Sequence, residues 1–156
     1  MSDISLIYIH GFNSSPQSWK AGVLRDYFER HGAGHRLHVP ALDPQPKKAM
    51  ATLEATIAGA GPVALLGSSL GGFYATWLAE HHDLVTAVVN PAVRPWRLLD
   101  KYTGINHNYH SGEAYQFDPA WLDELRHYQV EAVSKPEQML LLTQTGDETL
   151  NWEDGW

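Results

Sequence analysis

The stretch that most constrains the fold reads VALLGSSLGGFYATW and covers residues 63–77. Its first part is apolar as far as Gly67, which is typical of a strand buried on both faces of a sheet. After the turn, apolar side chains recur at helical spacing, at Leu70, Phe73, Tyr74, Trp77 and Leu78. We therefore predict a strand that runs through a tight glycine-rich turn directly into an amphipathic helix.

The turn itself, Gly67-Ser68-Ser69-Leu70-Gly71, follows the pattern G-x-S-x-G. In such a strand–turn–helix unit, small residues two before and two after the serine allow a sharp bend, and the serine stands exposed at the helix N-terminus. Backbone N–H groups and the helix dipole there favour developing negative charge. Ser69 is the candidate nucleophile, because only Ser69, and not Ser68, has glycine at both positions. The alternative is a plain Gly/Ser turn, which could bind phosphate.

The rest of the chain alternates short β-like runs with helical patterns. We predict strands at 5–9, 37–42, 63–67, 84–90 and 138–145, and helices from Ser15-Pro16 to Gly32, from Pro46 to about Gly59, after Ser69, near 95–101 and at 119–128. This order predicts one α/β domain over 1–156, with three α/β/α layers and a mostly parallel sheet of about five strands. The long segment 91–136, which includes a polar aromatic loop, is expected to form a lid-like insertion.

Composition narrows the choice of function. The chain has 156 residues, 44% of them hydrophobic, which suits one sizeable core. A formal net charge of −7 argues against nucleic acid or an anionic membrane as the main partner. There is no cysteine, so disulfides and thiolate metal sites are excluded. No apolar run has the length of a membrane span and no signal peptide is visible, so we expect a cytoplasmic protein.

A reactive serine needs donors for the oxyanion that forms on the substrate. One is expected to be the backbone N–H of Leu70, the residue after Ser69. The other is expected from the loop after the first strand, where Gly11 lets the backbone approach closely and Phe12 supplies the N–H. We expect His10 to support this loop through hydrogen bonds. The alternative is that His10-Gly11 is a simple strand-ending turn.

Four motifs in this order carry a resemblance: HGFNSSP at 10–16, GSSLGG at 67–72, NPAVRP at 90–95 and TQTGDE at 143–148. Together they resemble the α/β-hydrolase superfamily and, more narrowly, the small bacterial YqiA-type esterases. The resemblance implies hydrolysis of a small-molecule ester or thioester by Ser, Asp and His, with no cofactor. It also implies that Asp147, just past the end of the last strand, is the catalytic acid; the alternative is a turn residue after Gly146.

The histidine implied by the resemblance is missing, because no His follows His127 in the chain. Three explanations remain open: C-terminal truncation that removes the final strand and helix, substitution by His107 or His110, or a non-catalytic relative that binds a ligand. Without a base the chain is expected to be nearly inactive. The apolar edge at Met139–Thr145 is expected to favour self-association.

Two further groups of residues bear on metal and anion binding. His107-x-x-His110 would need a helix to hold a metal ion, and its glycine and asparagine neighbours predict a loop, so no metal site is expected. Arg94, Arg97 and Lys101 either contact an anionic part of a substrate or form a solvated face.

Overall fold

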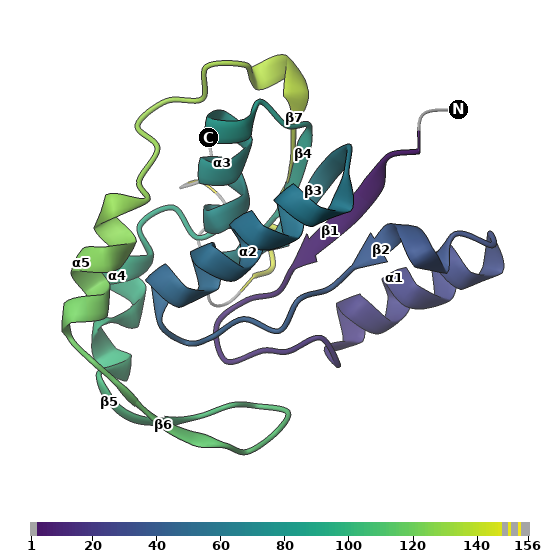
Figure 1. Ribbon diagram of the computed structural model, residues 1–156. Helices are drawn as coiled ribbons and strands as arrows, with labels where there is room; N and C mark the ends of the chain where they lie inside the picture. The colour runs from purple at the N-terminus through teal and green to yellow at the C-terminus, as the bar shows by residue number, and fades with distance from the viewer. Residues whose placement is uncertain (1–2, 148–149, 151–152, 154–156) are drawn as a thin grey trace.

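The computed structural model describes residues 3–147, 150 and 153. Its centre is a five-stranded sheet in the order β2-β1-β3-β4-β7, in which every neighbouring pair is parallel (Figure 1). The strands are β1 (Ser5–Ile9), β2 (Leu37–His38), β3 (Val63–Ser68), β4 (Thr86–Val89) and β7 (Met139–Leu142). The predicted fold class is confirmed.

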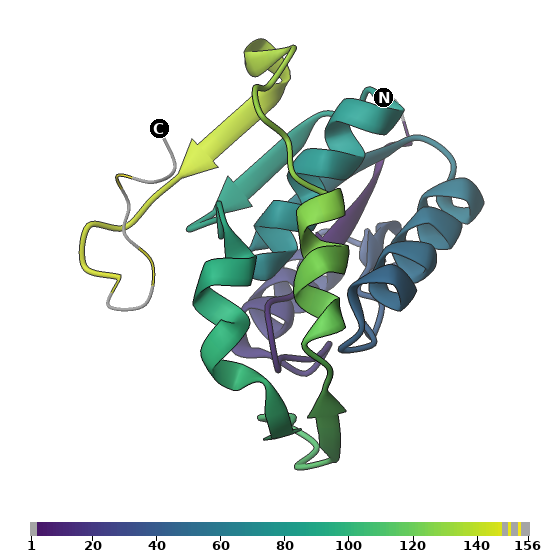
Figure 2. The ribbon, with the colours of Figure 1, turned by 90° about the vertical axis from the view of Figure 1, so that its left-hand side faces the viewer.

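Helices cover both faces of this sheet, and the handedness of the connections explains which helix lies where. The first three are α1 (Trp19–Arg30), α2 (Pro46–Ala60) and α3 (Leu70–His82). The chain steps one way from β1 to β2 through α1, and the other way from β2 to β3 and from β3 to β4 through α2 and α3. Because such crossovers are right-handed, α1 is placed on one face and α2 and α3 on the other (Figure 2).

Several predicted boundaries are wrong in an informative way. The strand expected at 37–42 stops at His38, two residues before Pro40, which cannot donate to a ladder. The strand expected at 138–145 spans only Met139–Leu142 and follows the 3₁₀ helix η3 (Pro136–Gln138). The first helix begins at Trp19 rather than after Ser15, because the Ser18 hydroxyl accepts the Ala21 N–H and caps it.

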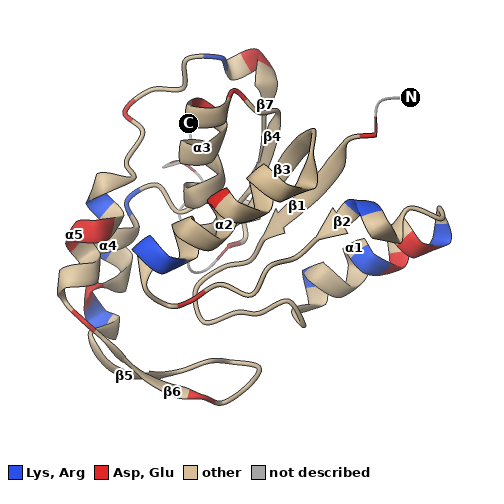
Figure 3. Ribbon diagram, in the orientation of Figure 1, with Lys and Arg blue, Asp and Glu red and all other residues tan. Residues whose placement is uncertain are grey.

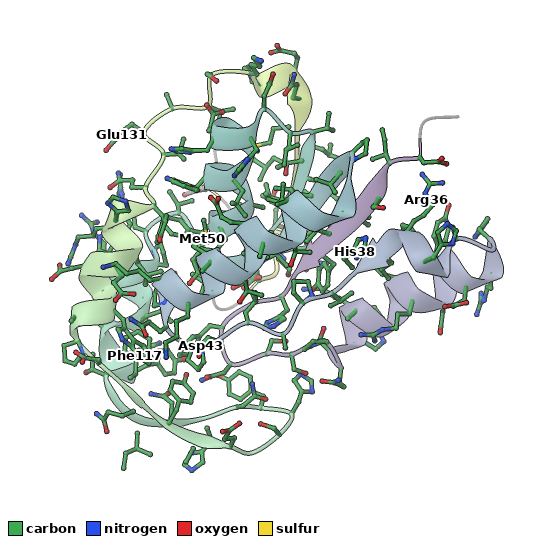
Figure 4. All side chains as sticks on the ribbon, viewed as in Figure 1. Arg36, His38, Asp43, Met50, Phe117 and Glu131 are labelled. Atoms are coloured by element: carbon green, nitrogen blue, oxygen red, sulfur yellow. The ribbon has the colours of Figure 1, made fainter. Side chains whose placement is uncertain are left out.

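The segment 91–136 has more regular structure than predicted. It contains α4 (Pro95–Leu99), η2 (Asp100–Tyr102), β5 (Gly104–His107), β6 (Ala114–Phe117) and α5 (Ala120–His127). The expected polar aromatic loop is an antiparallel hairpin of β5 and β6, so that prediction is wrong. Alternate residues of both strands pack inward, and Phe117 at the end of β6 is 1% exposed (Figure 4).

The core forms where α2 and α3 pack against β1, β3 and β4. Figure 3 shows no charged residue on these central strands. The largest fully buried apolar side chains include Ile7, Ile9, Leu53, Leu65, Leu78, Phe117 and Leu125. Leu125 lies on α5, so the same core extends beneath the insertion. A rigid platform therefore supports the carboxyl ends of β1 and β3.

Candidate active site

The candidate site lies where the carboxyl ends of β1 and β3 meet. These strands are adjacent, with Ile9 opposite Gly67, while the chain continues from them toward opposite edges of the sheet. Such a reversal leaves a crevice outside the strand ends, which is where open α/β sheets bind ligands. The loop after β1 begins at His10 and the turn after β3 centres on Ser69, so both motifs reach this crevice.

Ser69 occupies a strained backbone position between two glycines. Its φ is 56° and its ψ is −121°, a conformation that L-residues rarely adopt. A Cβ on Gly67 would lie 2.2 Å from the Gly71 carbonyl oxygen, and a Cβ on Gly71 would lie 2.0 Å from the Ile9 carbonyl oxygen. Both contacts are with backbone atoms, which cannot rotate away. The bend therefore requires glycine on both sides of Ser69.

Hydrogen bonds on both sides of Ser69 hold this strained backbone. Its N–H donates to the Val89 carbonyl at 3.1 Å. Its carbonyl accepts the N–H groups of Gly72, Phe73 and Ala92 at 2.9, 3.3 and 3.0 Å. The main chain at Ser69 is thus bonded to β4, to α3 and to the loop after β4. These hydrogen bonds fix the backbone from which the half-buried Ser69 side chain projects.

The loop after β1 passes directly beside Ser69. A Cβ on Gly11 would lie 3.3 Å from the Ser69 Cβ, which is a tight contact, and 3.7 Å from its Oγ. Phe12 follows Gly11, and Leu70 follows Ser69 at the start of α3. Within the described part of the chain, neither the Phe12 N–H nor the Leu70 N–H donates a hydrogen bond. Both N–H groups belong to residues that line one cavity with Ser69.

This cavity has a volume of about 540 Å³. Its polar lining residues include Tyr8, Ser14, Ser18, Lys20, Ser68, Ser69 and Lys101. The remaining lining is mostly apolar and aromatic and includes Ala92, Pro95, Leu98, Leu99, Tyr102, Tyr109 and Leu150. A volume of this size accommodates a small to medium organic molecule, with apolar surface for most of it and polar groups beside Ser69.

The hairpin of the insertion holds the loop that carries Phe12. The Tyr109 N–H donates to the Asn13 carbonyl at 2.9 Å, and the Asn108 side chain donates to the Ser14 carbonyl at 2.9 Å. The Tyr115 hydroxyl donates to the Asn13 side-chain oxygen. Burial raises the pKa of Tyr115 to about 12, so this hydroxyl keeps its proton at neutral pH. The insertion therefore fixes the loop after β1.

Comparison with known proteins adds the family. The sequence profile of the group described as "Uncharacterised protein family (UPF0227)" matches residues 5–154. The chain belongs to the UPF0227 family. The resemblance read from the four sequence motifs is thereby confirmed.

Solved structures similar to this UPF0227 protein share one fold. Mouse alpha/beta hydrolase domain-containing protein 10 has a TM-score of 0.71 at 17% identity, over 97% of this chain and 72% of the other. The Paleococcus ferrophilus monoacylglycerol lipase has a TM-score of 0.64 at 17% identity, over 96% of this chain and 76% of the other. An esterase domain from a Rhodothermus marinus protein has a TM-score of 0.62 at 20% identity, over 98% of this chain and 70% of the other. These TM-scores show that the UPF0227 chain has the α/β-hydrolase fold.

Asp147 follows β7, and the structure does not bring its side chain to the cavity wall. Asp147 is half-buried, and its carboxylate accepts the Leu150 N–H at 2.9 Å. Its N–H donates to the Gln144 carbonyl at 3.2 Å. Leu150 lines the cavity and Asp147 does not. The turn that contains Asp147 thus borders the site that Phe12, Ser69 and Leu70 share.

Asn90 was not singled out by sequence reasoning, although it anchors this turn. Its side chain donates to the Gln144 side-chain oxygen at 3.1 Å and accepts the Gln144 N–H at 2.7 Å. Its own N–H donates to the Leu142 carbonyl at 2.8 Å, and its φ of 43° fits asparagine better than most residues. The feature of the sequence that could have pointed to Asn90 is the Asn90-Pro91 dipeptide at the end of a predicted strand.

The histidines occupy places outside the Ser69 cavity. His10 is 4% exposed, with Nδ1 3.0 Å from the Gly11 carbonyl and Nε2 accepting the Leu42 N–H at 3.2 Å. These bonds fix its neutral form, and burial lowers its pKa. His110 lines a separate hollow of about 1020 Å³ together with His10, and His107 is exposed on β5. Among the described residues, no histidine lines the cavity that contains Ser69.

Across residues 3–147, 150 and 153, no three His, Asp or Glu side chains are grouped so that they could hold a metal ion. None of the described helices combines the length and the apolar character that crossing a bilayer requires.

Proposed function

We propose that this UPF0227 protein is a serine carboxylic-ester hydrolase that acts on small to medium acyl esters or thioesters. The observation that carries the proposal is the backbone of Ser69, held at φ 56° between two glycines that tolerate no Cβ. A cavity of about 540 Å³ opens beside it. The α/β-hydrolase fold and its esterase and lipase neighbours support the same reaction class.

In the proposed reaction, the Ser69 Oγ bonds to the acyl carbon and the carbonyl oxygen becomes an oxyanion. The N–H groups of Phe12 and Leu70 would donate to this oxyanion. The bond between the acyl carbon and the leaving oxygen or sulfur then breaks, and that atom takes the proton from the Ser69 hydroxyl. Water next cleaves the acyl-serine, which restores Ser69 and releases the acid. Asp147 is assigned the role of orienting the base.

Proton transfer by a base is the step that this chain performs poorly. No histidine of the described residues lines the cavity, and the sequence has no His after His127. We therefore infer that the 156-residue chain is nearly inactive alone. A serine hydrolase without its base keeps only about 10³–10⁴-fold acceleration over water, from the oxyanion donors and binding.

The insertion is assigned the role of a substrate-binding lid. Residues of α4 and η2 line the cavity, and so does Tyr109 between β5 and β6. The aromatic ring of Tyr102 lies 5.2 Å from that of Phe12, so the insertion packs against the proposed oxyanion loop.

The alternative function is a ligand-binding domain without catalysis. The absence of a histidine from the cavity lining among the described residues favours it. The two functions differ in one outcome: whether bound ester is turned over through Ser69.

The test uses p-nitrophenyl butyrate with and without added imidazole, which replaces the missing base from solution. We expect imidazole to raise turnover by the wild-type chain and by Ser68→Ala, but not by Ser69→Ala, once the reaction of imidazole alone is subtracted. Equal rates for the wild-type chain and Ser69→Ala at every imidazole concentration would exclude the hydrolase and leave the binding domain.

A further inference from the structure

A lysine from a distant part of the sequence lines the same cavity as the proposed nucleophile. The Lys20 Nζ donates to the Ser68 Oγ at 3.0 Å, although the residues are 48 positions apart. Lys20 lies in the first turn of α1, and both residues line the cavity that contains Ser69. Because Ser68 and Ser69 are consecutive and both line the cavity, the ammonium group lies in the same cavity as the reacting hydroxyl.

Neutral hydroxyl groups surround this ammonium. Tyr8 is 3% exposed, and its hydroxyl is hydrogen-bonded to the side chains of Ser68 and Ser18. Burial raises the pKa of Tyr8, so its hydroxyl stays protonated at neutral pH. The cluster of Tyr8, Ser18, Lys20 and Ser68 therefore offers one positive charge and several donors on one wall.

The charge of the cavity lining is unusual for the protein. The chain carries a net charge of −7, yet Lys20 and Lys101 are both lining residues, and no Asp or Glu of the described chain lines the cavity. No ion pair between described residues uses either lysine. A concave site lined by one sign of charge concentrates ligands of the opposite sign. The cavity is therefore suited to an anionic ligand.

We propose that the Ser69 cavity selects acyl esters that carry a carboxylate a few atoms from the reacting carbonyl, and that Lys20 determines this specificity. The proposal rests on the proposed hydrolase function and names its substrate class. The ammonium of Lys20 matches the charge of one carboxylate, and its bond to Ser68, the residue before Ser69, limits how far that carboxylate can lie from the reacting serine. The aromatic wall at Phe12 and Tyr102 holds the uncharged remainder of the substrate.

The test measures binding in the Ser69→Ala variant, so that no hydrolysis is needed. Isothermal titration calorimetry compares monobutyl succinate with its uncharged methyl ester, and with monobutyl suberate, whose carboxylate is further from the ester. We expect succinate to bind at least about fivefold more tightly than either, which corresponds to an accessible charge pair. Raising the salt concentration should reduce the preference over the methyl ester.

Three further substitutions assign this preference to one side chain. Lys20→Met should abolish it, Lys20→Arg should keep most of it, and Lys47→Met should leave it intact, because Lys47 carries the same charge on α2 outside the cavity lining. Circular dichroism checks that each variant is folded. Equal or undetectable binding of acid and methyl ester, or the same result for Lys20→Met and Lys47→Met, overturns the proposal. The imidazole experiment on Ser69 judges the hydrolase function independently of this result.

Discussion

The tightest contact in the site is between Gly71 and β1, and replacing Gly71 by alanine tests it. A Cβ there would lie 2.0 Å from the Ile9 carbonyl oxygen, 2.6 Å from the Ile9 carbonyl carbon and 2.8 Å from the His10 carbonyl oxygen. Normal contacts begin near 3.4 Å, so the end of β1 or the start of α3 must shift by more than 1 Å. The atoms are backbone, so no rotamer change can relieve the clash.

The energetic cost follows from two opposed terms. Overpacking typically costs about 1–3 kcal/mol and occasionally more, and a clash with backbone atoms that cannot rotate away lies at the upper end of this range. Alanine in place of glycine within a helix returns about 1 kcal/mol. We therefore expect Gly71→Ala to lose at least about 2 kcal/mol, which for a chain of this size lowers the midpoint of thermal unfolding by about 4–8 °C.

Thermal unfolding followed by circular dichroism measures this loss. Gly22→Ala is the matched control, because Gly22 lies in α1 with no atom within 4 Å of an added Cβ. That variant should be as stable as the wild type or more stable by about 0.5–1 kcal/mol. If Gly71→Ala unfolds at or above the wild-type temperature, the description of this turn is wrong.

Three other predictions concern the surroundings of the site. Burial lowers the pKa of His10, so below pH about 6.5 the native state takes up fewer protons than the unfolded state and loses stability as the pH falls. His10→Gln should therefore flatten the pH dependence of the unfolding free energy in this range, by at most about 1.4 kcal/mol per pH unit. Denaturant titrations across pH measure this slope, and an unchanged slope refutes it. Asn90→Ala should cost about 1–3 kcal/mol in the same titrations, because it removes both side-chain bonds to Gln144, whereas the control Gln116→Ala, which removes an exposed side-chain amide on β6, should cost less. Leu140→Lys should reduce self-association in size-exclusion chromatography, since Leu140 is 56% exposed on β7, an edge strand of the described sheet; a wild-type chain that is monomeric at high concentration contradicts this.

Local patterns predicted much of the fold because the local preference and the final packing agree there. The strand at 5–9 and the helix that begins at Pro46 were predicted with their observed starts, since an apolar run and an N-terminal proline specify them. The helix after Ser69 followed from its apolar spacing. The hairpin of β5 and β6 was missed, because glycine and asparagine there indicate a loop, and only packing against the rest of the domain shows that alternate residues face inward.

The site was predictable where sequence motifs mark it, at the turn around Ser69 and at the loop after β1. The pattern G-x-S-x-G placed Ser69 and Leu70 together, and strand order brought Phe12 to the same cavity. The contact from Lys20 to Ser68 was not predictable, since it joins residues 48 positions apart through the position of α1. The bonds between Asn90 and Gln144 likewise depend on β4 and β7 being neighbours.

The most direct measurement for the central claim is covalent labelling with an alkyl fluorophosphonate in the presence of imidazole, with the modified residue mapped by mass spectrometry. A serine that faces oxyanion donors should displace fluoride and form an oxygen–phosphorus bond. We predict an adduct on Ser69 that forms faster with imidazole, an adduct that stays on Ser69 in Ser68→Ala, and none in Ser69→Ala. Modification of Ser68 instead, or labelling of Ser69 no faster than that of exposed serines such as Ser111 and Ser134, would contradict it.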